Sequence, residues 1–261
     1  MSRPPMTENI EPMYSKVITT LYPVLQRITI RDWTGMEHVP RDGGFVAASN
    51  HISNMDHFPL AHFLVASGRA PHYLAKASLF KPPVVRQILQ GTGQIPVYRG
   101  TSRATSALSA ATEALERGAC VCVYPEGTIT REPDFWPMVG KSGAARLALE
   151  SGVPLVPFAI WGTQEMMWPY RDKVPKLLPR KLIHVAAGPE VDLSDLREGP
   201  IDAVKLRTAS VRLMDEITRL LEGIRHAKAP DTRFDPRTQH AARGGDGPHK
   251  IADPSETKGD R

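Results

Sequence analysis

The chain has 261 residues, of which 41% are hydrophobic and 23% charged, and its 33 basic and 28 acidic residues give a net charge of +5. This length is enough for one sizeable domain with a buried core, or for two small ones. The mild positive charge favours anionic partners such as phosphorylated metabolites, acidic carrier proteins or anionic lipid surfaces. The sequence has no dense Lys/Arg run and no recognisable nucleic-acid-binding motif, which argues against a nucleic-acid partner.

The hydropathy of the chain limits how it can meet a membrane. No stretch approaches the roughly 18–20 consecutive apolar residues of a spanning helix. The first residues also lack the apolar core of a signal peptide. We therefore expect a cytoplasmic protein that associates peripherally with the inner face of the cell membrane.

The N-terminal region is predicted to contain two parts. Residues 1–9 are expected to be disordered, and residues 10–34 to form a helical segment with apolar residues at helical spacing. Pro23 is expected to break or kink this helix because its ring cannot fit within the helical hydrogen-bond ladder. The apolar side of the segment either packs on its own domain or contacts a membrane interface, and both interpretations stay open.

Residues 35–225 alternate predicted strands and helices. We predict strands at 45–49, 72–75, 94–98, 119–124, 155–160 and 182–187, and helices near 54–67, 102–117, 142–151 and 201–222. This order is typical of a single α/β domain with a central mixed, largely parallel sheet flanked by helices. Residues 226–261 are rich in charge, Pro and Gly, and are predicted to be a disordered tail.

The chain has two cysteines, Cys120 and Cys122, and they lie two positions apart on a predicted strand. Both therefore point to the same face of the sheet. Neighbouring cysteines on one strand seldom have disulfide geometry, and no second Cys/His pair supplies a zinc site. We expect two small buried residues in a reducing compartment, and neither a metal nor a resident cofactor.

The stretch Asn50-His51-Ile52-Ser53-Asn54-Met55-Asp56 follows the predicted buried strand 45–49. On a continuous helix the His51 and Asp56 side chains would lie about 140° apart, so they meet only if the backbone bends between them. Ser53-Asn54 offers a helix N-cap for such a bend. Asp56 would then accept the proton of one ring nitrogen and leave the other free as a base. The pair alone is equally compatible with a surface loop histidine.

Three further blocks follow in order: Gly91-Thr92-Gly93-Gln94-Ile95-Pro96-Val97-Tyr98-Arg99, Tyr124-Pro125-Glu126-Gly127-Thr128 and Val153-Pro154-Leu155-Val156-Pro157. With Asn50-His51-(four residues)-Asp56 they closely resemble the glycerolipid acyltransferase family over about residues 35–190. That family comprises 1-acylglycerol-3-phosphate and glycerol-3-phosphate O-acyltransferases. The resemblance implies transfer of a fatty acyl group from a thioester of coenzyme A or acyl carrier protein to a glycerol-phosphate hydroxyl. We therefore expect residues 35–225 to form the acyltransferase domain, with His51 as general base and Asp56 orienting its ring.

The resemblance also implies how the acceptor is bound. Arg99 would bind the acceptor phosphate, for which its planar, permanently charged fork is suited. Glu126 would contribute to acceptor binding, either directly on a glycerol hydroxyl or by positioning Arg99. Asn50, Gly127 and Thr128 are expected to line the substrate site, with Gly127 permitting close approach of the backbone. The structural alternatives are a surface salt bridge for Arg99 and a helix-capping carboxylate for Glu126.

One position departs from the family pattern. Many members place an arginine directly after Glu-Gly-Thr, whereas this chain has Ile129. Two cations are candidates for the missing contact. Arg131 is the nearest, and Lys141 lies just before a predicted helix whose N-terminus also favours an anion. Lys76, beside the predicted strand 72–75, is a further candidate, and a solvated lysine is the alternative interpretation.

Two other classes of protein remain open. A serine hydrolase or thioesterase would share the His–Asp pair, but it usually needs a Gly-x-Ser-x-Gly elbow, which this sequence lacks. A non-catalytic lipid- or carrier-binding module would not need a base with an orienting acid. Within the transferase reading, a monoacylated acceptor that yields phosphatidic acid is favoured over glycerol-3-phosphate because the chain is short. Acyl length, donor carrier and oligomeric state are left undetermined.

Overall fold

The strands of this chain assemble into one seven-stranded sheet. The computed structural model describes residues 6–8, 10–98 and 104–238. The strand order is β1-β7-β6-β2-β5-β3-β4, and all neighbours are parallel except the antiparallel pair β6 and β7. The strands are β1 Thr29–Thr34, β2 Phe45–Ser49, β3 Pro71–Lys76, β4 Ile95–Val97, β5 Cys120–Val123, β6 Leu155–Trp161 and β7 Lys181–Ala187. This confirms the expected mixed, largely parallel sheet.

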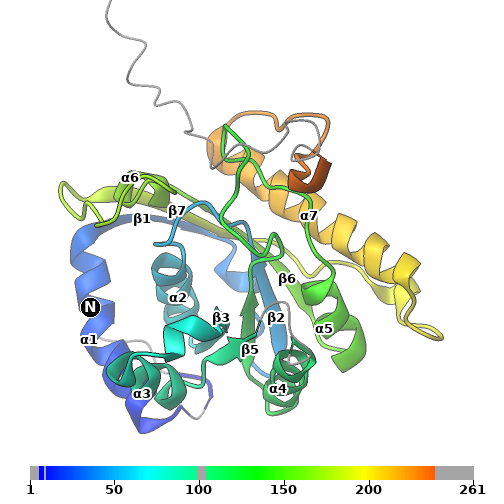
Figure 1. Cartoon of the computed structure of the whole chain (residues 1–261), viewed down its shortest axis with the longest axis horizontal. Helices are drawn as coiled ribbons and strands as arrows, with labels where there is room; N and C mark the ends of the chain where they lie inside the picture. The colour runs from blue at the N-terminus through cyan, green and yellow to red at the C-terminus, as the bar shows by residue number, and fades with distance from the viewer. Residues whose placement is uncertain (1–5, 9, 99–103, 239–261) are drawn as a thin grey trace, which may run out of the picture.

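Helices cover both faces of the sheet (Figure 1). The α-helices are α1 Pro12–Ile28, α2 His57–Ala66, α3 Pro83–Gly91, α4 Ala104–Glu116, α5 Gly143–Ser151, α6 Thr163–Met166 and α7 Ala203–Arg225. Short 3-10 turns are η1 Met36–His38, η2 Ala77–Phe80 and η3 Ser194–Leu196. Helices α4, α5 and α7 contribute to the hydrophobic cluster on one face, and α2 contributes to the cluster on the other. Helix α1 packs on α2, and α3 packs on α1.

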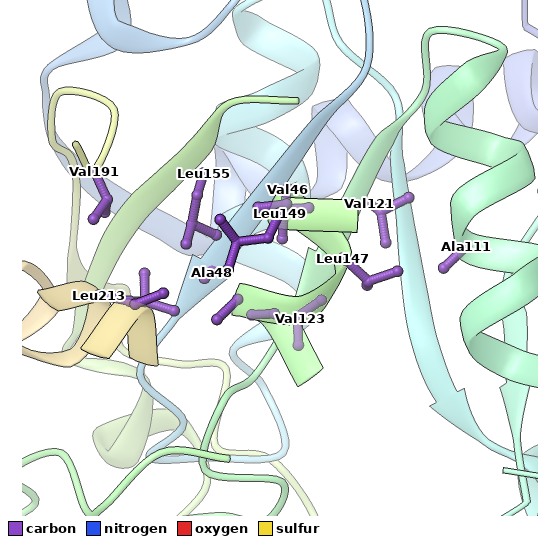
Figure 2. Packing of buried hydrophobic residues seen from close by; sticks show 14 of the residues in the cluster. Val46, Ala48, Ala111, Val121, Val123, Leu147, Leu149, Leu155, Val191 and Leu213 are labelled. Carbon is purple, nitrogen blue, oxygen red and sulfur yellow. The ribbon is translucent and has the colours of Figure 1, made fainter. Parts of the chain in front are cut away.

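The central strand β2 is buried along its whole length because helices cover both of its faces. Val46 and Ala48 point into the cluster formed with α4, α5 and α7, part of which is drawn in Figure 2. Phe45 and Ala47 point into the opposite cluster. The free cysteines of β5 also belong to that opposite cluster, which confirms that they share a face.

The six predicted strands are present, and each end lies within one residue of its predicted position. The N-terminal prediction was partly wrong. Pro23 does not end α1, because burial of residues such as Leu25 beyond it offsets the roughly 3 kcal/mol cost of an internal proline. The predicted helical segment 10–34 stops at Ile28, and Thr29–Thr34 forms β1, which pairs with β7. Helix α3 was also missed.

The prediction of a disordered tail from residue 226 was wrong for residues 226–238. Residues 226–238 pack on the domain: the Val139 N–H donates to the Phe234 carbonyl (2.9 Å), and Arg233 pairs with Asp215 at 2.9 Å. The error arose because charge and proline content hid these specific contacts. The rest of the predicted tail lies outside the described residues. Among the helices that the structure describes, none is both long and apolar enough to cross a membrane.

Candidate active site

The turn between β2 and α2 brings His51 and Asp56 together. His51 Nδ1 lies 2.8 Å from Asp56 Oδ2, so the predicted bend is confirmed. The position of the helix start was wrong, however. Helix α2 begins at His57 with Asp56 as its N-cap residue, and Ser53 lies in the preceding turn. The Asp56 side chain folds back toward this turn because the peptide N–H groups there point at it.

The Asp56 carboxylate is fully buried and surrounded by donors. Its Oδ2 accepts the Ile52 N–H (2.7 Å) and the Ser53 N–H (2.9 Å), and its Oδ1 accepts the Thr163 hydroxyl. An oxygen that already accepts two N–H groups favours the imidazole tautomer with its proton on Nδ1. Nε2 of His51 is then left with a free lone pair, as a general base requires.

Aromatic rings fix the plane of the His51 imidazole. The Tyr124 ring stacks on it with centroids 4.2 Å apart and an angle of 21° between the planes. The His57 ring meets it edge-on at 5.5 Å. Burial, followed by the proximity of His51, lowers the pKa of His57 to about 4. His57 is therefore neutral near pH 7 and places no positive charge beside the His51 ring.

The loop that follows β5 holds the backbone of His51. Glu126 Oε1 accepts the His51 N–H at 3.0 Å, and Oε2 accepts the Met138 N–H at 3.0 Å. The His51 carbonyl in turn accepts the Thr130 N–H at 2.7 Å. The Glu126 side chain is buried and does not line the cavity described below. Its carboxylate was predicted to contribute to acceptor binding, on a glycerol hydroxyl or by positioning Arg99. In the structure it accepts the backbone N–H groups of His51 and Met138.

A cavity of about 1110 Å³ opens beside His51. Most of its lining is apolar and comes from helices α1, α2 and α3 and strand β3, through residues such as Val17, Leu21, Phe58, Leu74 and Ile88. The lining also includes polar residues, among them His51, Lys76, Lys141 and the start of α5. The cavity therefore combines a mostly apolar lining with two lysines and with three histidines, His51, His57 and His62.

The other predicted site residues separate into two groups. Gly127 lines the cavity together with Lys76 and Lys141, and a Cβ on Gly127 would lie 2.8 Å from Lys141 Nζ. Glycine is needed there for a second reason. Its φ of +71° is a left-handed backbone conformation that residues with a side chain rarely adopt. Thr128 and Arg131 are absent from the lining, and Arg131 is exposed.

Asn50 was predicted to bind substrate, but its amide is used inside the protein. Its Oδ1 accepts the Ile160 N–H at 2.8 Å, and its Nδ2 donates to the Ile160 carbonyl at 3.0 Å. These two bonds tie the end of β2 to β6, and the side chain is fully buried. Arg99, the predicted phosphate ligand, lies outside the described residues.

Sequence patterns did not predict Thr163, Thr130 or the stacking ring of Tyr124. A positional signal existed for Thr163, since it follows the predicted strand 155–160 at the carboxyl edge of the sheet, where sites form in α/β proteins. Finding it required knowledge that β6 neighbours β2, and the linear order of the strands does not reveal this.

A family model described as Acyltransferase matches residues 31–161, which is half of the chain. The chain belongs to this family. The turn between β2 and α2, the loop after β5 and strand β6 all fall in the matched region of this acyltransferase.

Named relatives are glycerolipid enzymes. The chain is 31% identical over 138 residues to "1-acyl-sn-glycerol-3-phosphate acyltransferase BAT2, chloroplastic" of Brassica napus, which covers 52% of this chain and 38% of the relative. It is 32% identical over 131 residues to a 1-acyl-sn-glycerol-3-phosphate acyltransferase of Borreliella burgdorferi, covering 50% of each. The chain thus spans half or less of the length of these relatives.

A solved structure shares the fold. The 1-acyl-sn-glycerophosphate (LPA) acyltransferase PlsC from Thermotoga maritima superposes with a TM-score of 0.62 at 23% sequence identity, and the match covers 83% of both chains. Agreement over this share of both chains supports a fold of one α/β domain.

The burial of Glu126 leads to a prediction about stability and pH. Burial raises the pKa of this carboxyl group to about 8 from its ordinary value of 4.5. Its contribution to stability is therefore fully present below pH 4.5 and is lost as the pH rises toward 8. We expect wild type to lose stability relative to Glu126→Gln between about pH 5.5 and about pH 8, because glutamine does not titrate. Urea unfolding at both pH values measures this difference.

Glu150→Gln is the matched control, because Glu150 lies on α5 with a half-exposed side chain that pairs with Arg146. Its free energy of unfolding should differ from wild type by a small amount that does not grow across this pH range. A difference between wild type and Glu126→Gln that is equal at both pH values would contradict the raised pKa.

Proposed function

We propose that this acyltransferase is a 1-acylglycerol-3-phosphate O-acyltransferase. It would move a fatty acyl group from an acyl thioester to the free hydroxyl of 1-acylglycerol-3-phosphate and so form phosphatidic acid. The observation that carries the proposal is the His51–Asp56 pair, 2.8 Å apart, beside a cavity whose lining is mostly apolar and includes Lys76 and Lys141. The names of the curated relatives support the monoacylated acceptor.

The chemistry needs one proton to move twice. Nε2 of neutral His51 takes the proton of the acceptor hydroxyl as the oxygen attacks the thioester carbonyl. Asp56 stabilises the resulting imidazolium through Nδ1 without taking its proton. When the tetrahedral intermediate collapses, the carbon–sulfur bond breaks and His51 returns the proton to the departing thiolate. The products are an oxygen ester and a free thiol, and no covalent acyl-enzyme is needed.

The lining of the cavity offers partners for both the apolar and the charged parts of the substrates. The apolar interior between α1, α2 and α3 suits an acyl chain, which gains free energy from leaving water. Lys76, Lys141 and the first peptide groups of α5 suit the acceptor phosphate, because cations and helix N-termini both stabilise anions. Arg99 stays our proposed further phosphate ligand, and Val97, two positions earlier, lines the cavity.

Replacing the base should stop the reaction. We expect His51→Ala to lower kcat by about 1,000-fold, since it removes general base catalysis. The measurement is ester formation from acyl-CoA and 1-acylglycerol-3-phosphate, with glycerol-3-phosphate compared side by side. His184→Ala is the matched control, because His184 forms a similar pair with Asp32 at 2.9 Å between β7 and β1, and it does not line the cavity.

The products also separate the alternatives. Free fatty acid in place of ester would indicate a hydrolase, and neither product would indicate a binding module. A His51→Ala variant with a near-wild-type rate would remove His51 from the mechanism.

Lys141 provides a test of phosphate binding. We expect Lys141→Met to raise the KM of the acceptor on the order of 10-fold, as loss of one charge-assisted hydrogen bond predicts, with the donor KM nearly unchanged. Lys228→Met is the control, since Lys228 is exposed and does not line the cavity. Equal increases in both KM values would argue against a phosphate contact.

We also propose that the enzyme docks on the anionic inner face of the cell membrane. Two exposed apolar surfaces support this. On α1, Leu21 and Val24 are 39% and 43% exposed, while in the segment 168–182 Val174 and Leu178 are 73% and 74% exposed. The cations of this segment are Arg171, Lys173, Lys176, Arg180 and Lys181, against the single acid Asp172. Apolar tips among cations are suited to anionic lipid.

The segment 168–182 is also tied to the catalytic turn. The Tyr170 hydroxyl donates to the Ile129 carbonyl at 2.7 Å, in the loop that holds His51. Just before the segment, the Met167 carbonyl accepts the Ser53 hydroxyl at 2.8 Å. Docking through this segment would therefore orient the active site relative to the lipid surface.

Binding to lipid vesicles tests the docking. We expect the double variant Val174→Ser/Leu178→Ser to partition onto phosphatidylglycerol-containing vesicles on the order of 10-fold less than wild type, because less apolar area enters the lipid. Val204→Ser/Val211→Ser is the matched control, since these valines of α7 are 71% and 48% exposed. Equal loss in both double variants would refute a specific docking segment.

A further inference from the structure

We propose that Arg225 is a positioning residue that holds His51 in place from the far end of helix α7. It acts through the segment 126–139, here called the bracing loop. The inference rests on the proposed role of His51 as base. Helix α7 lies outside the region 31–161 that the acyltransferase family model matches, so the family resemblance assigns it no role.

The bracing loop bonds to both backbone polar groups of His51. Glu126 accepts its N–H at 3.0 Å, and the Thr130 N–H donates to its carbonyl at 2.7 Å. The imidazole projects from this peptide unit, so a displacement of the bracing loop displaces the ring. Nε2 must reach the hydroxyl proton at hydrogen-bonding distance, which makes the rate sensitive to such a displacement.

Hydrogen bonds inside the bracing loop link Thr130 to Trp136. The Thr130 hydroxyl donates to the Trp136 carbonyl at 3.0 Å. The Trp136 N–H donates to the Glu132 carboxylate at 2.8 Å, and the Asp134 N–H donates to the same oxygen at 2.8 Å. The position of the buried Trp136 is therefore transmitted through Thr130 to the carbonyl of His51.

Arg225 fixes Trp136 to the end of strand β6. Its guanidinium carbon lies 3.9 Å from the centroid of the Trp136 ring and 4.2 Å from that of Trp161. Its Nη1 donates to the Asp134 carbonyl at 2.8 Å. A planar cation between two indole rings, with a hydrogen bond to the same loop, resists movement of the loop away from β6.

The residues after α7 hold the bracing loop at its other end. The Phe234 carbonyl accepts the Val139 N–H at 2.9 Å, next to Met138, whose own N–H binds Glu126. Arg233 pairs with Asp215 of α7 at 2.9 Å and keeps this stretch on the helix. The bracing loop is therefore held by α7 near Trp136 and by the following residues at Val139.

Kinetics of the full chain test the proposal. We expect Arg225→Ala to lower kcat on the order of 100-fold, the size of effect that a small misplacement of a reacting group produces. Both KM values should stay within about 2-fold of wild type, because the cavity lining does not include Arg225. Arg225→Lys should recover part of kcat, since it keeps the charge but loses the planar stack. Arg219→Ala is the control, because Arg219 is an exposed residue of α7 that pairs with Glu216.

Hydrogen exchange gives a readout that does not depend on activity. In Arg225→Ala, amides of residues 126–139 and 50–56 should exchange faster, while those of β2 and β6 stay as protected as in Arg219→Ala. Trp136→Phe keeps a ring against the guanidinium and should show the same local change to a smaller extent. This variant replaces Arg225→Ala in the experiment if Arg225→Ala does not fold. If wild type makes no ester but this local change is seen, the proposed function is wrong, whereas the proposed hold of Arg225 on the bracing loop is supported.

Two results would overturn the proposed positioning role of Arg225. One is a wild-type kcat and wild-type exchange in Arg225→Ala. The other is faster exchange throughout the domain in all the Arg225 and Trp136 variants, together with a kcat that falls only in proportion to the folded fraction. That result would mean that Arg225 only stabilises the fold.

Discussion

A carboxylate with no solvent exposure, Asp56, is the constraint on which the site depends. Burying a charge is costly unless hydrogen bonds replace its water, and here two peptide N–H groups, a ring N–H and a hydroxyl do so. These donors come from the turn itself and from the start of α6. If the turn changed conformation, the buried Asp56 carboxylate would lose these hydrogen bonds. The need to keep them holds the His51 ring in one orientation.

The sheet order explains why these particular groups meet. Strand β2 lies between β5 and β6, so the segments that leave these three strands are neighbours at one edge of the sheet. The β2 segment carries His51, the proposed base, the β5 segment carries Glu126, and the β6 segment carries Thr163. Parallel strands place their carboxyl ends at the same edge, where α/β proteins bind ligands. A single topological feature therefore supplies the base, the support for its backbone and the support for its acid.

The site is supported by elements both inside and outside the region that the family model matches. The matched region holds His51, Asp56 and most of the residues that bond to them, whereas Thr163, α7 and the stretch to residue 238 lie beyond it. Nevertheless, α7 adds a large share of one hydrophobic cluster and contacts β6 closely. The position of catalytic groups thus depends on packing far along the chain from the motifs that identify the family, and the cavity depends on α1 and α3 in the same way.

The sequence by itself determined the α/β class, six strands to within a residue, the family, and the pairing of His51 with Asp56. These follow from local patterns: apolar runs, turn residues and short motifs whose spacing forces a bend. The three-dimensional structure was needed to show that Asn50 and Glu126 bind backbone, that Arg131 stays outside the cavity and that β1 joins the sheet. It was also needed to show that residues 226–238 pack on α7 and the loop at Val139. Each of these depends on partners distant in sequence, such as Ile160 for Asn50 and Met138 for Glu126, because side-chain hydrogen bonds form with whatever the strand order brings near.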